Sequence, residues 1–391
     1  MRILIVLTYY RPHTSGLTIY AERLAKALAR RGHQVTVFTT QYDSSLPLEE
    51  VLDGVRVIRS PILLKISKGV ISPTFGYRVT GLVRQADVIH LHLPQFDAAG
   101  VALRGRLFGV PSVITYHCDL QLPRGLFNAV VNQVVHIMNN LAARLTNRVI
   151  TYTQDYADHS PFLRRYLKKV KIIQPPVVLP VAAPGAAREF ARKHQLKGSG
   201  PCIGMAARFA TEKGVEVLLD AMPAILKKFP SARVLFAGQY QNVIGEDRYA
   251  ARLFPRIQEL IDQDHWKWLG VIGQDEMAAF YKNLNVLTVP SLNSTESFGL
   301  VQVEAMMNGV PVAASNLPGV RQPVKMTRMG EIFEIGDSAM LAEKICAILE
   351  APASYIMDPA WMIEHFSPDT VAEVYEKLFT GLVDEGKGRN A

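Results

Sequence analysis

The chain has 391 residues, of which 49% are hydrophobic and 20% charged, and its net charge is +8. This length exceeds one ordinary hydrophobic core, so two domains are expected. No apolar run approaches the length of a membrane span, and residues 1–7 are too short for a signal-peptide core. The three cysteines show no zinc-ligand spacing, which favours a cytosolic chain with free thiols.

The charge is unevenly distributed. Residues 1–171 contain 22 Lys/Arg and 10 Asp/Glu, an excess of +12, whereas the remainder of the chain is net negative at −4. A basic half is compatible with anionic lipid, a phosphate-bearing substrate or nucleic acid as a partner, and equally with an ordinary basic surface.

The chain opens with a strand–helix–strand pattern. Residues 3–7 form a buried apolar run, 18–31 have helical apolar spacing, and 34–39 read as the next strand. The connection lacks G-x-G-x-x-G and is therefore a poor dinucleotide fingerprint. Gly16 lies where the helix begins, and it could admit a ligand close to the backbone or serve as a plain turn residue.

Histidines follow in two predicted strands. Residues 62–82 are expected to be a loop and a helix. Residues 87–93 then form a strand with His90 and His92 on one face, but no third ligand is identifiable and no metal site is expected. The strand at 113–116 ends in His117, at a position where α/β proteins build sites, although a hydrogen-bonded histidine near the core is equally compatible.

Residues 126–145 carry an apolar stripe at helical spacing, with Arg144 and Arg148 at its end. Further cations, including Arg164 and Arg165, follow shortly afterwards. Such a stripe usually faces a core, but apolar and basic character together also suit an anionic membrane surface.

The second half begins after a proline-rich stretch at 174–187, which predicts an interdomain linker. Residues 202–206 form a strand, a loop follows, and 215–229 form a helix. Arg208 and Lys213 flank this loop. They could bind a diphosphate together, or they could be two solvated cations.

A compact strand–loop–helix–strand unit covers residues 285–315. The strand ends at Pro290, and the helix runs from Phe298 to a stop at Asn308-Gly309. The amides of Gly299 and Leu300 would lie in the first helical turn, where unpaired N–H groups favour an anion.

Two carboxylates flank this predicted anion site. Glu296 lies just before the helix and Glu304 inside it, so both could accept hydrogen bonds from hydroxyl groups of a phosphate-linked ligand. Alternatively, Glu296 caps the helix and Glu304 is a solvated helix residue.

The segment Glu296-Ser-Phe-Gly-Leu-Val-Gln-Val-Glu304, followed by Gly309-Val-Pro-Val312, resembles the Glu-x7-Glu signature of retaining glycosyltransferase family four. Residues 207–214 are similar to the family's Arg-x4-Lys pyrophosphate clamp. The resemblance covers nearly the whole chain and departs at the linker, where Pro-Pro-Val replaces an Asn-Gly turn. It implies an α/β protein of GT-B architecture, in which two Rossmann-like domains face an interdomain cleft.

The resemblance also implies domain boundaries. It predicts an acceptor-side domain at 1–173, a linker at 174–187, a nucleotide-sugar-binding domain at 188–367, and a C-terminal helix at 368–391 that crosses back to the first domain.

The nucleotide-sugar site that the resemblance implies comprises Gly16, Arg208, Lys213, Phe298, Gly299, Leu300 and Glu304. Its catalytic residues would be His117, which positions the sugar, and Glu296, which accepts from sugar hydroxyls and supports charge on the sugar. Asp119 would lie on the acceptor side. No metal and no cofactor are expected, because two cations and a helix start already face the diphosphate.

The implied activity is transfer of a hexose from a UDP- or GDP-sugar, with retention, to a glycan or lipid-linked acceptor of cell-envelope biosynthesis. The expected location is cytoplasmic, with an anionic membrane surface as a further candidate partner and no nucleic acid. The rival readings are a GT-B-like nucleotide-sugar epimerase and a non-catalytic sugar- or lipid-binding protein. A dehydrogenase is weaker because the dinucleotide fingerprint is missing.

Overall fold

The computed structural model describes residues 1–66, 69–121, 126–196 and 200–388. Its contacts divide the chain into two units. Unit 1 combines residues 1–177 with the C-terminal segment from 365 onward, and unit 2 comprises 178–364. The divisions therefore fall at 177/178 and 364/365, whereas the sequence predicted them at 173/174 and 367/368.

Unit 1 is built on a sheet with strand order β10-β9-β8-β7-β1-β2-β4-β3, in which every neighbouring pair is parallel except β3 with β4. The strands are β1 Arg2–Val6, β2 Gln34–Gln41, β3 Glu49–Leu52, β4 Val55–Pro61, β7 Val88–Leu93, β8 Ser112–Tyr116, β9 Arg148–Thr151 and β10 Val170–Ile172. The helices are α1 Gly16–Arg30, α2 Phe75–Gln85, α3 Ala98–Leu107, α4 Leu126–Leu145, α5 Gln154–His159 and α14 Pro368–Gly388, with short 3-10 turns η1 Leu163–Arg165 and η2 Leu167–Lys169. The division at 364/365 falls within α13 Ala360–Phe366.

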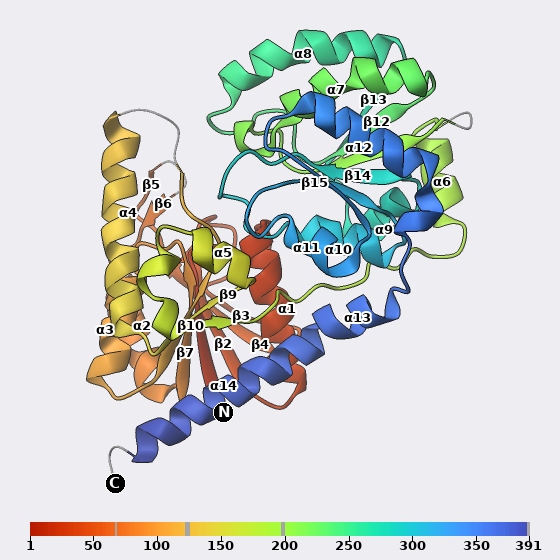
Figure 1. Cartoon of the computed structure of the whole chain (residues 1–391). Coiled ribbons are helices and arrows are strands. Elements are labelled where there is room, and N and C mark those ends of the chain that lie inside the picture. Colours follow the sequence, from red (N-terminus) through yellow and green to blue (C-terminus); the bar gives the residue numbers. More distant parts are fainter. Residues whose placement is uncertain (67–68, 122–125, 197–199, 389–391) are drawn as a thin grey trace. The chain divides into compact units, whose positions relative to one another are not determined.

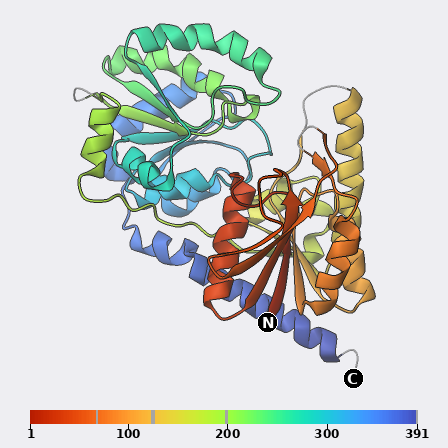
Figure 2. The same cartoon turned by 180° about the vertical axis from the view of Figure 1, so that it is seen from behind.

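The two faces of this sheet differ in chemistry. Alternate residues of β1, β7 and β8, such as Leu4, Leu91 and Ile114, pack against α2, α3, α4 and α5 in an apolar core. The opposite face carries buried polar residues, among them His90 and Thr115, and Tyr375 of α14 covers them. Figures 1 and 2 show α14 running along this sheet beside α1.

Unit 2 is built on a fully parallel sheet with order β13-β12-β11-β14-β15-β16. The strands are β11 Cys202–Ala206, β12 Arg233–Ala237, β13 Trp266–Gly270, β14 Val286–Val289, β15 Val312–Ser315 and β16 Gly330–Phe333. The helices are α6 Ala186–Lys193, α7 Val215–Lys228, α8 Asp247–Asp262, α9 Gln274–Lys282, α10 Leu300–Met307, α11 Gln322–Thr327 and α12 Ser338–Glu350, with 3-10 turns η3 Thr211–Lys213 and η4 Pro352–Tyr355.

The strand order of unit 2 is the Rossmann order 3-2-1-4-5-6, in which successive strands are added on one side of the first strand and then, from the fourth strand onward, on its other side. Ligands of such sheets bind beyond the carboxyl ends of the strands at this switch point. In unit 2 the switch point lies between β11 and β14, so the loops that follow these two strands form the expected binding position.

Three predicted elements need correction. Residues 62–82 contain two short antiparallel strands, β5 Leu64–Ile66 and β6 Gly69–Ile71, before α2 begins, and residues 67–68 lie outside the described part. The predicted linker ends earlier, because α6 begins at Ala186. The helix expected from Phe298 begins at Leu300, because Gly299 has a left-handed backbone with φ +78°.

The predicted helix at 126–145 has the bounds of α4. The predicted C-terminal helix begins at Pro368 as expected, and its last three residues lie outside the described range. No helix within the described residues is long and apolar enough to cross a membrane.

Candidate functional site

The loops that follow β11 and β14 are joined at the switch point. Gly214 has φ +66°, and a Cβ at this position would lie 2.1 Å from the Pro290 carbonyl oxygen. The Leu292 amide donates to the Glu212 carbonyl oxygen at 2.9 Å. Only glycine permits this approach, because any side chain would collide with the neighbouring backbone. The contact brings η3 beside the polar loop at 291–297.

This approach places Lys213 on Glu296. The Lys213 ammonium lies 2.5 Å from the Glu296 carboxylate, and both side chains are about one-fifth exposed, at 20% and 21%. Arg208 is more open, at 48% exposed, and it donates to Glu212 at 3.1 Å. Glu296 therefore pairs with a cation of the neighbouring loop and is not the helix cap that one sequence reading allowed.

The start of α10 completes this group. Gly299 is the N-cap, no side chain in the described part of the chain caps the helix, and its first turn carries no acidic residue. The fully buried Gln302 amide donates to the Phe298 and Val320 carbonyl oxygens at 2.8 and 3.0 Å, which holds the loop ahead of the helix. The Leu300 amide thus begins a turn whose N–H groups lack helical partners, and such a turn favours an anion.

Two residues of the predicted site are less accessible than the sequence suggested. Glu304 is only 8% exposed, and it accepts a hydrogen bond from the Tyr281 hydroxyl at 3.0 Å, so it is not a solvated helix residue. The Phe298 side chain is 1% exposed and belongs to the core. Leu300 is intermediate in exposure.

In unit 1, Gly16 is the first residue of α1. The helix begins here because Ser15 and Thr18 form a capping box, in which the Ser15 hydroxyl accepts from the Thr18 amide and Thr18 accepts from the Ser15 amide. Gly16 is exposed, and a Cβ added to it would meet no atom within 4 Å. The helix start is therefore open to a ligand.

His117 directly follows β8 and is enclosed by other side chains. Its Nε2 lies 2.8 Å from His92 Nδ1, and its Nδ1 forms a short hydrogen bond with the Tyr152 hydroxyl. The residue is 6% exposed, and burial lowers its pKa well below the ordinary value, so the imidazole is neutral. Both ring nitrogens are thus engaged within unit 1.

Asp119 lies two residues further and is engaged as well. Its carboxylate accepts from the Tyr116 hydroxyl at 2.8 Å and from the Ser160 hydroxyl at 2.7 Å, and its amide donates to the Tyr156 hydroxyl at 2.7 Å. Burial, followed by the nearby Asp119 charge, raises the pKa of both tyrosines. These contacts give Asp119 a definite structural role in the loop after β8.

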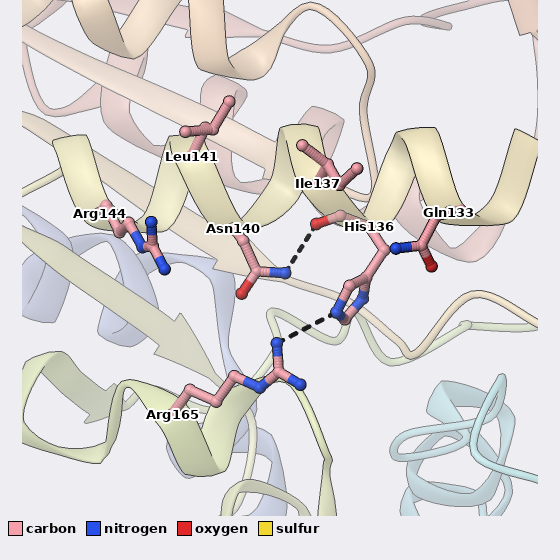
Figure 3. Close-up of a pocket in the computed structure, with 7 residues that line it drawn as sticks. All are labelled: Gln133, His136, Ile137, Asn140, Leu141, Arg144 and Arg165. Atoms are coloured by element: carbon pink, nitrogen blue, oxygen red, sulfur yellow. Dashed lines mark hydrogen bonds between the residues drawn. The ribbon is translucent and has the colours of Figure 1, made fainter.

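A separate surface hollow lies between α4 and η1. It has a volume of about 290 Å³ and is lined by Gln133, His136, Ile137, Asn140, Leu141, Arg144 and Arg165. Figure 3 shows Arg165 pointing toward His136, to which it donates at 3.3 Å. Among the described residues neither Arg144 nor Arg165 has a carboxylate partner, whereas Ile137 and Leu141 are 48% and 40% exposed. The hollow is therefore both cationic and apolar.

The structure thus brings the loop that carries Arg208 and Lys213 beside Glu296 and the start of α10 in unit 2. In unit 1 it places His117 and Asp119 after the end of β8, and Gly16 at the start of α1. Sequence reasoning missed Tyr152, Tyr281 and Gln302. Tyr152 could have been found from its position directly after β9. No group of three metal-ligating side chains occurs in the residues that the structure describes.

Two family models match the chain. "Glycosyl transferase 4-like domain" matches residues 15–176, and "Glycosyl transferases group 1" matches residues 187–358. Among curated relatives, the phosphatidyl-myo-inositol mannosyltransferase of Mycobacterium leprae is 27% identical and the match covers 99% of this chain and 98% of the relative. The GDP-mannose-dependent alpha-(1-6)-phosphatidylinositol monomannoside mannosyltransferase of Mycobacterium tuberculosis is 23% identical, with 95% and 96% covered.

Solved structures show the same fold. Sucrose-phosphate synthase from Thermosynechococcus elongatus superposes with a TM-score of 0.76 at 22% identity, covering 97% of this chain and 99% of that one. The structure of Anabaena HepE in complex with UDP superposes with a TM-score of 0.76 at 20% identity. The match covers 97% of this chain and 100% of that one. The fold and the family matches define a glycosyltransferase of the GT-B type. The chain belongs to glycosyltransferase family four.

Proposed function

We propose that this glycosyltransferase transfers a hexose from a nucleoside diphosphate sugar to an acceptor hydroxyl with retention of the anomeric configuration. The observation that carries the proposal is the Lys213–Glu296 ion pair at the Rossmann switch point, beside the uncapped start of α10. A cation can bind a diphosphate, and a carboxylate beside it can bind the hydroxyl groups of the sugar attached to that diphosphate.

In the proposed site, Arg208, Lys213 and the α10 amides hold the diphosphate and stabilise the charge that develops on it. Gly16 allows the phosphate to approach the start of α1. Glu304 accepts from ribose hydroxyls. Glu296, released from Lys213 by the diphosphate, accepts from sugar hydroxyls and supports positive charge on the sugar.

The reaction breaks the bond between the anomeric carbon and the phosphate oxygen and forms a bond from that carbon to the acceptor oxygen on the same face. The leaving phosphate takes the acceptor proton, so neither a covalent enzyme intermediate nor a separate base is required. We propose that no metal or cofactor takes part, because two cations and a helix start supply the positive charge.

The relatives support a narrower substrate class. One is named as GDP-mannose-dependent, and those named above act on phosphatidylinositol lipids. A further relative is named D-inositol 3-phosphate glycosyltransferase, and HepE was solved with UDP. We therefore propose a UDP- or GDP-hexose as donor and a glycan or lipid-linked acceptor of the cell envelope, with inositol phosphates and phosphatidylinositol as the first acceptors to test.

A lipid-linked acceptor would require approach to a bilayer. We propose that the exposed face of α4 meets an anionic membrane at its cytoplasmic side. Val130, Val134, Ile137 and Leu141 are between 39% and 64% exposed on this helix, and Arg144 and Arg165 lie beside them. Apolar side chains that enter the interface, together with cations that meet lipid phosphate, are the features of an interfacial helix.

The test of the activity is a thermal-shift screen of UDP-, GDP- and ADP-hexoses, because a ligand of the folded state raises its melting temperature. The donor found is then incubated with each acceptor, and with no acceptor. Transfer confirms the proposal, an altered free donor indicates an epimerase, and binding without turnover indicates a non-catalytic binding protein.

The membrane contact is tested by flotation with liposomes of neutral and of anionic lipid. Arg144→Ala/Arg165→Ala should float less than wild type on anionic liposomes at low salt. Lys227→Ala/Arg248→Ala, which removes the same charge from exposed positions of unit 2, should not differ from wild type. Equal behaviour of the two double variants would reject the α4 surface.

A further inference from the structure

The surface hollow between α4 and η1 lies along two adjoining stripes of α4. Side chains three or four positions apart share one side of a helix. The polar stripe, which lines the hollow, comprises Gln133, His136, Asn140 and Arg144. The exposed apolar stripe comprises Val130, Val134, Ile137 and Leu141. Figure 3 shows the polar stripe on the side of α4 that faces Arg165, with Ile137 and Leu141 on the other side.

The two chain segments that form the hollow contain no acidic residue. Residues 120–154, which include α4, and residues 159–188, which include η1, have neither Asp nor Glu. The side chains that line the hollow accordingly include two guanidinium groups, those of Arg144 and Arg165, and no carboxylate. A hollow with this excess of positive charge favours an anionic ligand.

Neither arginine is needed to cap α4. Lys169 Nζ donates to the carbonyl oxygens of Ala143, Arg144 and Thr146 at 3.1, 2.9 and 2.8 Å, which satisfies the end of the helix. Within the described part of the chain, the Arg165 guanidinium makes one hydrogen bond, to His136 Nε2 at 3.3 Å. A guanidinium has five N–H donors, so this bond orients Arg165 over the hollow and leaves it able to bind an anion.

The size and charge of the hollow indicate which anion would fit. Its volume of about 290 Å³ is at the lower end of the range for ligand sites, so it suits a headgroup and not a whole lipid. A phosphate monoester carries about −1.5 to −2 charge at pH 7 and has three acceptor oxygens, which matches two guanidinium groups. A phosphodiester carries a single negative charge and matches them less well.

We infer that this hollow binds the phosphate monoester headgroup of a membrane lipid, with Arg144 and Arg165 on the phosphate and the apolar stripe in the bilayer interface beside it. The inference rests on the proposed membrane contact of α4. It adds a defined site for one class of lipid to the general attraction between a basic surface and an anionic membrane. Both walls of the hollow belong to unit 1.

The first test is flotation with phosphatidylcholine liposomes that contain either phosphatidic acid, a monoester, or phosphatidylglycerol, a diester, adjusted to the same surface potential. The wild type should bind the phosphatidic acid liposomes roughly tenfold more tightly, because the monoester adds a charge-assisted contact. Arg144→Ala and Arg165→Ala should each lose this preference. The matched control is Arg164→Ala, which removes the same charge from the neighbouring exposed position of η1, outside the hollow, and should keep the preference.

Equal affinity of the wild type for the two lipids would overturn the inference, as would equal loss of the preference in Arg164→Ala and Arg165→Ala, because only diffuse charge would then act. A second measurement needs no membrane. Glycerol 3-phosphate should shift the ring NMR signals of His136 in the intact protein, assigned with His136→Gln, whereas glycerol should not. An unchanged His136 signal, or the same shift in Arg165→Ala, would also overturn the inference.

The proposed function can fail separately. No flotation on either lipid would reject the membrane contact of α4 and this inference with it. Hexose transfer to a soluble acceptor is measured in parallel. Lipid preference without transfer would overturn the proposed activity alone, whereas transfer without lipid preference would overturn this inference alone.

Discussion

Lys213 and Glu296 are 83 positions apart, yet the ammonium and the carboxylate lie 2.5 Å from each other. They meet because the first and fourth strands of a Rossmann-ordered sheet are neighbours and Gly214 lets their loops touch. Glu296 thus pairs with the cation to which we assign the diphosphate. In the proposed site, donor binding would exchange one anion for another and release the carboxylate toward the sugar.

Removing either cation should reduce transfer strongly. Arg208→Ala and Lys213→Ala each remove a preorganised contact to the leaving diphosphate, and such losses cost on the order of 10²-fold or more in kcat/KM. Steady-state kinetics measure the effect. Lys227→Ala, an exposed cation elsewhere in unit 2, is the control and should match wild type. Near wild-type rates in both loop variants would refute the diphosphate assignment.

Substitution of the two glutamates should have different effects: loss of Glu296 should lower turnover, and loss of Glu304 should weaken nucleoside diphosphate binding. Glu296→Ala removes the anion that competes for Lys213, so affinity for the nucleoside diphosphate should be kept or increase while turnover falls. Glu304→Ala removes the carboxylate that we propose to accept hydrogen bonds from ribose hydroxyls, and it should weaken nucleoside diphosphate binding. Calorimetry decides between these outcomes, and equal loss of affinity in both variants would mean that the roles are wrongly divided.

Gly214 should tolerate no side chain. Gly214→Ala combines a left-handed backbone with a Cβ placed 2.1 Å from the Pro290 oxygen. Gly245→Ala is the matched control, since its φ is +84° but its Cβ would meet no atom within 4 Å. We expect a lower melting temperature in both variants, with a larger fall and weakened donor binding only for Gly214→Ala. Equal shifts would show that the loop contact is unimportant.

Unit 1 should become less stable in mild acid. Burial lowers the pKa of His90 and His117 well below the ordinary value of 6.5, and that of His92 to about 3. Below pH 6.5 the unfolded chain binds more protons at these positions than the folded one, so stability is constant above 6.5 and falls as the pH decreases. Each histidine contributes a slope of up to about 1.4 kcal/mol per pH unit.

Melting temperatures between pH 7.5 and 5 test this prediction. His90→Gln should flatten the dependence, because it removes one of these buried imidazoles. A melting temperature independent of pH over this range would contradict the burial of neutral histidines.

The stereochemical outcome should not depend on Asp119. Its carboxylate is engaged by Tyr116 and Ser160, so Asp119→Asn should lower stability but yield the same anomer. An α-linked donor should give an α-linked product, and activity should survive EDTA. Anomeric couplings in the NMR spectrum of the product measure the configuration. A β-linked product would overturn retention and the role proposed for Glu296.

Local patterns predicted the elements that periodicity controls. The helix α4 was bounded correctly, because its apolar stripe and flanking residues define it. The β5–β6 pair was missed, since a three-residue strand has too little alternation to recognise. The start of α10 was placed two residues early, because apolar spacing does not reveal the left-handed conformation of Gly299 that precedes the helix.

The candidate site likewise combines residues that a local motif predicts with contacts that it does not predict. Arg208, Lys213, Glu296 and Glu304 were predicted as site residues because each lies in a local motif. The pairing of Lys213 with Glu296 and the hydrogen bonds of His117 with His92 and Tyr152 join residues from different strands. Such contacts depend on strand order, which no local pattern specifies.

Unit 1 is completed by both ends of the polypeptide, because α14 returns to the sheet that the first 177 residues form. During translation, the Tyr20 and Thr115 hydroxyls are made long before Tyr375, the residue that later bonds to both. All of unit 2 is synthesised in the interval, as one uninterrupted segment of the chain. The unit 1 sheet can therefore gain its covering helix only after all of unit 2 has been made.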